Sequence, residues 1–61
     1  MDYLSYNVAV NLKQIRLSKG MSLGEVAEQT GVSKSMLALI EKGDGNPTLG
    51  ILWKIANGLG V

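Results

Sequence analysis

The sequence predicts an all-α domain built from four or five short helices. Apolar residues recur at helical spacing in several segments, and capping residues, glycine or proline bound these segments. No stretch sustains the two-residue alternation of a β-strand. With 61 residues, the range 1–61 is expected to form one domain. A chain of this length buries only roughly 60% of the surface that it exposes when unfolded, so its stability should be modest.

Composition narrows the range of functions. The chain contains no cysteine and no histidine, which removes disulfides, thiolate and imidazole metal ligands, and the usual pairs of nucleophile and base. The five acidic residues are scattered and offer no convincing acid/base pair. We therefore expect no enzyme activity, no metal and no cofactor.

Hydropathy and charge say less about the partner. No apolar run approaches the roughly 20 residues needed to cross a bilayer, so no membrane contact is expected and a cytoplasmic protein follows by default. The formal net charge of +1 favours no partner by itself, because modules that bind nucleic acid usually carry a clear basic excess.

The first predicted helix covers residues 3–19. Gly20 is expected to end it, and Asp2, Ser5 or Asn7 could cap its start. Its buried positions recur at helical spacing and are Leu4, Val8, Leu12 and Ile15. Three cations follow near its end, at Lys13, Arg16 and Lys19. For Lys13 and Lys19, a solvated basic face that suits the helix dipole explains the pattern as well as a binding role does.

The second predicted helix starts at a capping box, in which Ser22 accepts from the N–H of Glu25 and the glutamate reaches back. Met21 and Val26 stand where a hydrophobic staple would form. One buried face of this helix is expected to hold Leu23, Val26, Ala27 and Thr30.

The third predicted helix repeats these signals after a tight turn at residues 31–33. Ser33 is its N-cap, Val32 can staple onto Leu37, and Lys42-Gly43 forms a basic last turn with a glycine stop. At about 100° per residue, one side holds Met36, Leu37 and Ile40, and the other holds Lys34, Ser35, Ala38, Leu39 and Lys42. Residues 22–43 are therefore predicted to form a helix-turn-helix.

A breaker cluster at residues 44–48 predicts a loop, with Thr48 as the N-cap of a last helix that Gly60 ends. The buried face of this helix is expected to hold Leu49, Leu52, Trp53, Ala56 and Leu59, with Ile55 beside it. Trp53 could be a stacking platform for a base or ligand, but its spacing favours the core.

Three of the eight glycines, Gly24, Gly50 and Gly58, fall inside predicted helices. Each interior helical glycine costs roughly 0.5–1 kcal/mol relative to alanine. Either close helix approach needs these glycines or another chain adds stability.

A helix-turn-helix can insert its second helix into the major groove of DNA, while the first helix lies across the backbone. Lys34 could donate to guanine O6 and N7, and Ser35 can donate or accept. Ala38 and Leu39 offer apolar contact, for instance with a thymine methyl group. Leu39 could instead contact a protein or pack at the edge of the core, and the three alternatives stay open.

The motifs resemble those of the Cro/repressor-type (XRE) helix-turn-helix domains over residues 12–61. Ala27 stands where the two helices cross, Gly31 lies in the turn, and Leu37 and Ile40 are core positions. The resemblance implies a lambda-repressor-like DNA-binding fold and a transcriptional regulator. The runs Val-Ser-Lys-Ser-Met-Leu and Leu-Trp-Lys-Ile-Ala-Asn-Gly-Leu-Gly-Val look most like regulators that join this domain to a C-terminal cupin sensor.

The resemblance also implies roles for individual residues. Lys34 and Ser35 fall where base-contacting side chains stand, whereas Leu39 replaces a common glutamine. Arg16 and Glu41 fall where the family has an ion pair joining the first and third helices. Phosphate contacts are expected from Ser22, Asn46, Thr48, Lys42 and Lys19. Two positions should weaken binding to the DNA backbone. Leu23 replaces a phosphate-contacting glutamine, and Asp44 lies in a loop that is basic in phage relatives.

The family normally has a fifth helix after a sequence like Leu59-Gly60-Val61. We therefore expect either the N-terminal part of a longer regulator, with its effector domain outside this chain, or a domain without that helix. The Trp53/Leu59 side would then be partly exposed. A homodimer on a palindromic operator is expected, because two half-sites lie one helical turn apart.

Two hypotheses follow. The first is sequence-specific binding of double-stranded DNA by a dimeric transcriptional regulator, with Lys34 and Ser35 contacting bases. The second is a protein-interaction or antitoxin-like module that uses the same fold, in which Leu39, Met36 and the truncated C-terminal end bind another polypeptide and DNA binding is incidental. The low net charge and Leu39 favour the second hypothesis.

Overall fold

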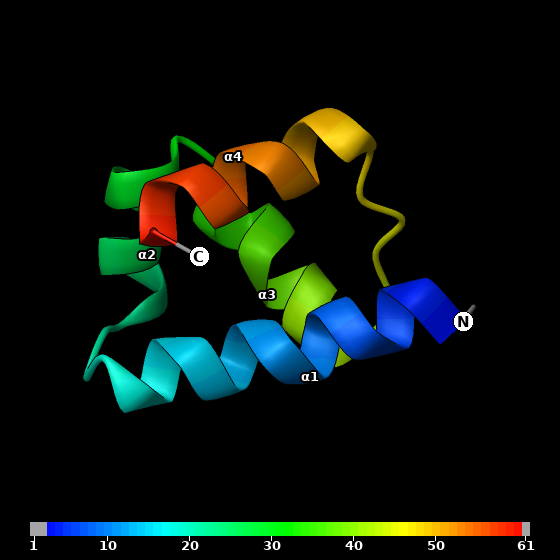
Figure 1. The fold of residues 1–61 in the computed structure, drawn as a ribbon, viewed down its shortest axis with the longest axis horizontal. Helices are drawn as coiled ribbons and strands as arrows, with labels where there is room; N and C mark the ends of the chain where they lie inside the picture. Colours follow the sequence, from blue (N-terminus) through cyan, green and yellow to red (C-terminus); the bar gives the residue numbers. More distant parts are fainter. Residues whose placement is uncertain (1–2, 61) are drawn as a thin grey trace.

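The computed structural model describes the backbone of residues 3–60 and the side chains of residues 7–60. Within this range the chain forms four helices and no strand (Figure 1), namely α1 (Tyr3–Ser18), α2 (Leu23–Thr30), α3 (Lys34–Lys42) and α4 (Leu49–Leu59). The all-α prediction is confirmed, as is the helix-turn-helix. Ser5 and Asn7 lie inside α1 and do not cap it. The proposed cap Asp2 and the side chain of Leu4 lie outside the described residues.

Hydroxyl side chains start three of the helices, as predicted. Ser22, Ser33 and Thr48 each accept a hydrogen bond from the backbone N–H three residues later, at 3.1, 3.1 and 3.2 Å. At Ser22 the backbone N–H donates in return to Glu25 Oε1 at 2.9 Å, which completes the capping box. These bonds satisfy backbone donors that a helix start leaves without a partner.

Glycines in the left-handed region end α2 and α3. Gly31 has a φ of 76° and its N–H donates to Ala27 O, while Gly43 has a φ of 84° and its N–H donates to Ile40 O. A side chain with a Cβ rarely adopts these angles. The two glycines therefore fix where each helix of the helix-turn-helix stops.

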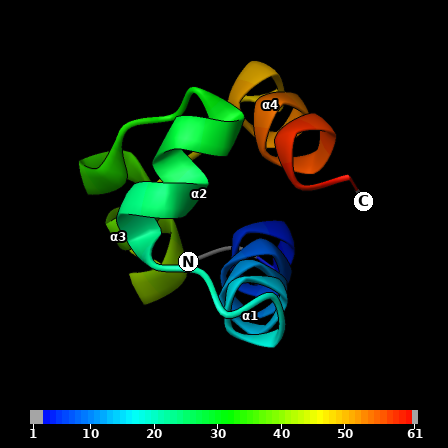
Figure 2. The same ribbon diagram turned by 90° about the vertical axis from the view of Figure 1, so that its left-hand side faces the viewer.

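The helices pack around α2 and α3. α2 packs against both α3 and α4, and α1 packs against α3. In Figure 2, α3 lies on the left of the view and α1 and α4 lie further to the right. The buried cluster at the centre draws on all four helices and the turn, and consists of Leu12, Val26, Val32, Leu37, Ile40, Ile55 and Leu59.

The predicted buried face of α4 is partly wrong. Leu59 is buried as expected and Leu52 and Ala56 are half-buried, but Leu49 is 80% exposed and Trp53 is 67% exposed. The residues of α4 that pack in or against the core are Leu59, as predicted, and Ile51 and Ile55, which lie outside the predicted stripe. α4 is apolar on most of its circumference, so helical spacing alone allows two neighbouring stripes. Packing against α2 selects the stripe that contains Gly58.

Gly58 marks the closest approach of α4 to α2. A Cβ placed there would lie 2.7 Å from both the carbonyl oxygen of Gln29 and the Cα of Thr30. At Gly24 and Gly50 the nearest atoms are the capping hydroxyls, at 3.8 and 3.7 Å, which is ordinary contact. Close helix approach therefore explains Gly58 but not the other two helical glycines.

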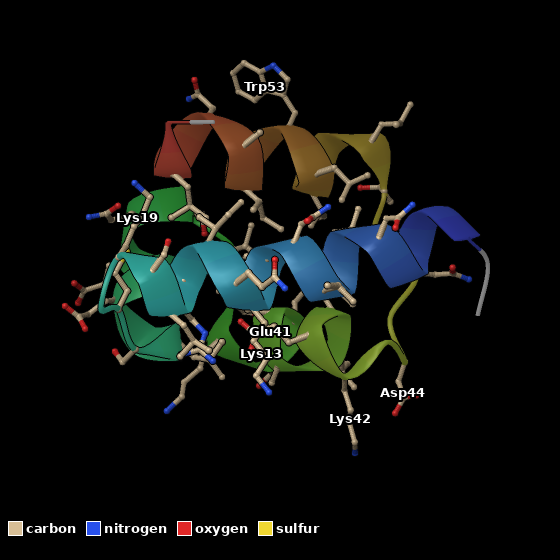
Figure 3. The ribbon with its side chains drawn as sticks, turned by 60° about the horizontal axis from the view of Figure 1, so that its bottom comes forward. Lys13, Lys19, Glu41, Lys42, Asp44 and Trp53 are labelled. Carbon is tan, nitrogen blue, oxygen red and sulfur yellow. The ribbon has the colours of Figure 1, made fainter. Side chains whose placement is uncertain are left out.

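An open apolar groove of about 200 Å³ runs between α1 and α4. Its lining comes from both helices and consists of Val8, Asn11, Leu12, Ile15, Leu52, Ile55, Ala56 and Leu59. Trp53 lies on the outer side of α4, beyond this groove (Figure 3). The expected exposure of the Trp53/Leu59 side thus holds for Trp53 but not for Leu59.

Trp53→Ala should change the free energy of unfolding by about 1 kcal/mol at most, because an exposed side chain loses little burial. Ile55→Ala on the same helix should cost about 2–5 kcal/mol, since Ile55 is part of the core. Thermal or urea unfolding followed by circular dichroism measures both. Equal large losses would show that Trp53 is buried.

Gly58→Ala should destabilise the fold by about 1–3 kcal/mol, because backbone atoms of α2 must move to admit the new methyl group. Gly50→Ala is the matched control on the same helix. Alanine there should stabilise by up to about 1 kcal/mol, because it raises helix propensity without a clash. A stabilising Gly58→Ala would contradict the close packing of α4 on α2.

Candidate functional site

The outer face of α3 carries the residues expected from the helical pattern. Lys34, Ser35, Ala38, Leu39 and Lys42 are all exposed on α3. On the opposite side Leu37 and Ile40 are buried, and Met36 is half-buried against the core. The core therefore holds α3 by one side and presents the other side to solvent.

The start of α3 concentrates hydrogen-bond donors. Ser33 Oγ accepts from Met36 N–H and Ser33 O accepts from Leu37 N–H. The N–H groups of Lys34 and Ser35 come before the first intrahelical bond, so they remain available to an external acceptor. The side chains of these two residues add an ammonium group and a hydroxyl at the same end. This edge can donate to base edges or to a phosphate.

Thr30 fixes the turn that leads into α3. Its hydroxyl donates to Val26 O at 2.8 Å and accepts from Val32 N–H at 3.2 Å, and the residue is buried. The sequence predicted Thr30 as a core position and missed this second role. A threonine immediately before a glycine helix stop is the signal that could have found it, because its hydroxyl can bond to nearby backbone groups.

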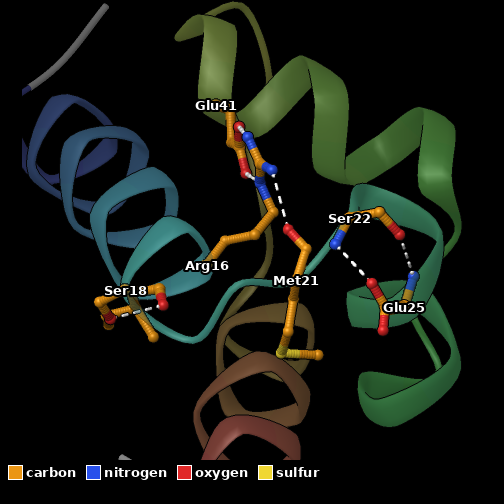
Figure 4. Close-up of polar contacts among 7 residues, drawn as sticks. Arg16, Ser18, Met21, Ser22, Glu25 and Glu41 are labelled. Atoms are coloured by element: carbon orange, nitrogen blue, oxygen red, sulfur yellow. Dashed lines mark hydrogen bonds and ion pairs between the residues drawn. The ribbon is translucent and has the colours of Figure 1, made fainter.

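Arg16 joins three segments of the chain (Figure 4). Its Nε and Nη2 donate to the two carboxylate oxygens of Glu41 at 2.7 and 3.0 Å, and its Nη1 donates to Met21 O at 3.1 Å. The side chains of Arg16 and Glu41 are only 15% and 10% exposed. This ion pair, which the resemblance implies, ties α1 to α3 and to the segment before α2.

The hydrogen bond to Glu41 is the main cause that raises the pKa of the Arg16 guanidinium above its ordinary value. Desolvation opposes the shift, and Coulomb attraction to Glu41 adds to it. Because the folded-state pKa is raised, the contribution of the guanidinium to stability is present below its unfolded-state pKa. It is lost as the pH rises through the folded-state pKa, in strongly alkaline solution.

The residues predicted to contact phosphates are not all on one side. Ser22, Asn46, Thr48 and Lys42 are exposed, and Lys42 Nζ lies 3.9 Å from Asp44 Oδ2. In Figure 3 the side chain of Lys42 points to the lower edge of the view, on the side of α3. Lys19 lies at the left edge of the view, away from Lys42, so the structure does not bring the two lysines together.

Leu39 is 44% exposed and is not among the apolar side chains that pack against the core. This exposure gives no support to the interpretation of Leu39 as packing at the core edge. Contact with a thymine methyl group and contact with another protein stay open as predictions. Its carbonyl oxygen accepts from Asp44 N–H at 3.1 Å, which holds the start of the following loop.

The described residues contain no group of three or more His, Cys, Asp or Glu side chains placed to hold a metal ion. None of the four helices in the range 3–60 is long and apolar enough to cross a membrane.

Comparison with known proteins finds relatives that are transcriptional regulators. Residues 12–61 match a family model described as helix-turn-helix. The chain is 49% identical over its 61 residues to the HTH-type transcriptional regulator SutR of Escherichia coli strain K12. Over 55 residues it is 42% identical to the HTH-type transcriptional regulator SinR of Bacillus subtilis strain 168.

A solved structure agrees with this placement. The crystal structure of an HTH_3 family transcriptional regulator from Vibrio cholerae matches 93% of this chain, with a TM-score of 0.90 and 49% identity. The match covers 32% of that protein, and the matches cover 34% of SutR and 50% of SinR. The chain thus spans about a third to a half of the length of these relatives.

Glu41→Ala and Arg16→Ala should each lower the melting temperature, because each leaves the other charge poorly compensated in a mostly buried place. The double variant should lose less than the sum of the two single losses, since the residues interact directly. Glu28→Ala removes an exposed carboxylate from α2 and serves as the control, with little expected change. Additive effects in the double variant would show that the pair does not stabilise the fold.

Proposed function

This chain belongs to the helix-turn-helix family, and on that premise we propose that it is the DNA-binding domain of a transcriptional regulator. In this proposal α3 enters the major groove of double-stranded DNA, which is about 12 Å wide and admits a helix. α2 lies across the backbone. The observation that carries the proposal is the exposed donor edge of Lys34 and Ser35 at the start of α3.

Sequence recognition would follow from the face of α3. Lys34 can donate to the O6 and N7 acceptors of guanine, whereas Ser35 can donate or accept and so discriminates less. Ala38 and Leu39, further along the same exposed face, can contact a thymine methyl group. Because the side chain of Leu39 cannot form a hydrogen bond, this position would favour a methyl group over a polar base edge.

Contacts with the DNA backbone would come from the starts of the helices beside α3. Ser22 precedes α2 and Thr48 precedes α4, and both are exposed N-cap residues. The N–H groups and the dipole at a helix N-terminus suit a phosphate, and Asn46 in the loop before α4 can add a side-chain donor. Lys42 supplies a charge, although Asp44 lies nearby and offsets part of it.

We further propose a homodimer on a palindromic operator. A single module of this size makes few contacts, and two copies related by a two-fold axis would reach half-sites one helical turn apart. The relatives are longer than this chain, so a C-terminal effector part, such as a cupin sensor, stays a prediction. No enzymatic role is proposed. We infer a cytoplasmic location, because in a cell without a nucleus the DNA lies in the cytoplasm.

The groove between α1 and α4 favours protein interaction as a second candidate function. Its lining is almost wholly apolar, and Trp53 is exposed on the outer side of α4. Trp53 points away from the side on which Lys42 lies in Figure 3, so a protein bound there would leave the outer face of α3 free. An antitoxin-like role would combine this contact with DNA binding.

Binding to duplex DNA over a salt series tests the main proposal. The logarithm of the binding constant should fall linearly with the logarithm of the salt concentration, because phosphate contacts release counterions. Fluorescence anisotropy on sequences selected from a random pool measures this slope. Absence of salt-dependent binding to any selected or genomic duplex would contradict the proposal.

Lys34→Ala should weaken binding to the selected site by about 1–3 kcal/mol and relax the base preference at one position. An unrelated duplex of equal length serves as the control, and its affinity should fall less. An equal loss on both duplexes would show that Lys34 binds a phosphate instead of a base.

A further inference from the structure

A lysine on α1 lies on the same side of the molecule as the outer face of α3. In Figure 3, Lys13 and Lys42 both point to the lower edge of the view, and Asp44 lies beside Lys42. Lys19, in the turn just after α1, lies at the left edge of the view, and Trp53 on α4 points to its top. The sequence groups Lys13 and Lys19 as cations near the end of one predicted helix, whereas the structure places them on different sides of the molecule.

The ion pair of Arg16 explains where Lys13 lies. Arg16 reaches across to Glu41 on α3, which immediately precedes Lys42. Residues three apart on a helix are neighbours on its surface, so Lys13 stands one turn from Arg16 along the edge where α1 meets α3. The bidentate bond thus holds Lys13 near the C-terminal end of α3.

The charge of Lys13 has no structural use in the described part of the chain. The ion pairs there join Arg16 to Glu41 and Lys42 to Asp44, and neither includes Lys13. Arg16 is the basic residue in the last turn of α1, whereas Lys13 comes before that turn, where the helix dipole gains little from a cation. The side chain is exposed, so it contributes little to packing.

We propose that Lys13 binds a backbone phosphate of the DNA in which α3 is inserted. This inference rests on the proposed function. A helix that fills the major groove brings the elements beside it against the bordering strands, and α1 is the element beside the C-terminal end of α3. Lys13 and Lys42 would then form a basic edge that extends phosphate binding from the helix-turn-helix onto α1.

The basic edge formed by Lys13 and Lys42 would offset two features of the domain that weaken its binding to the DNA backbone. Arg16 is engaged by Glu41 and Met21 O, so its charge is not free for a phosphate. Asp44 lies 3.9 Å from Lys42 and reduces the field of that lysine, although both side chains are well exposed and solvent screens the pair. Lys13 has no such carboxylate beside it among the described residues.

The test compares Lys13→Gln with Lys19→Gln in the full chain. Both variants remove one charge from an exposed position, in α1 for Lys13 and in the turn just after α1 for Lys19, so their net charge is the same. The probe is a duplex selected by the wild-type chain from a random pool, beside an unrelated duplex of equal length. Lys13→Gln should reduce the salt slope by about one unit and weaken binding about fivefold to tenfold near 0.1 M salt, equally on both duplexes. Lys19→Gln should have a smaller effect on both quantities.

Each other outcome overturns the inference in a distinguishable way. Equal losses in the two variants would show a general effect of net charge. A loss for Lys13→Gln confined to the selected duplex would show a base contact, and a lowered melting temperature that accounts for the loss would show a structural role. If the wild-type chain itself shows no salt-dependent binding, the proposed function fails and the inference fails with it. Wild-type binding with no specific effect of Lys13→Gln overturns the inference alone.

Discussion

The arrangement of this small domain depends on the bidentate contact between Arg16 and Glu41. The guanidinium links α1 to α3, and its third hydrogen bond reaches Met21 O just before α2. Both charged side chains are largely buried, so the pair is satisfied only in this geometry. The contact between Arg16 and Glu41 therefore decides which side of α1 lies against α3.

The domain presents two different sides as a result. The outer face of α3 is polar at its start and has one lysine, Lys42, at its far end, while the groove between α1 and α4 is apolar. DNA binding and protein contact could thus use separate surfaces of one chain. A core of this size is modest, so partner contact at the groove would also add stability.

The candidate site was accessible to sequence reasoning only in part. The N-cap at Ser33 and the core residues Leu37 and Ile40 fix the orientation of α3, which is why Lys34 and Ser35 could be named in advance. Sequence reasoning named Lys19 and not Lys13 for a phosphate contact, because the positions of the two lysines relative to α3 depend on how α1 packs. Their separation became visible only with Arg16 bound to Glu41.

The sequence by itself determined the number and approximate limits of the helices and the turn between α2 and α3. These features depend on bonds between residues close in the chain, such as the capping box at Ser22 and the left-handed stop at Gly31. Tertiary structure decided which stripe of α4 is buried. α4 is apolar on most sides, and only the contact of Gly58 with the backbone of α2 selects Ile55 for the core and leaves Trp53 in solvent. Periodicity gives the angles between side chains on one helix, but the direction of the neighbouring helix is a property of the whole fold.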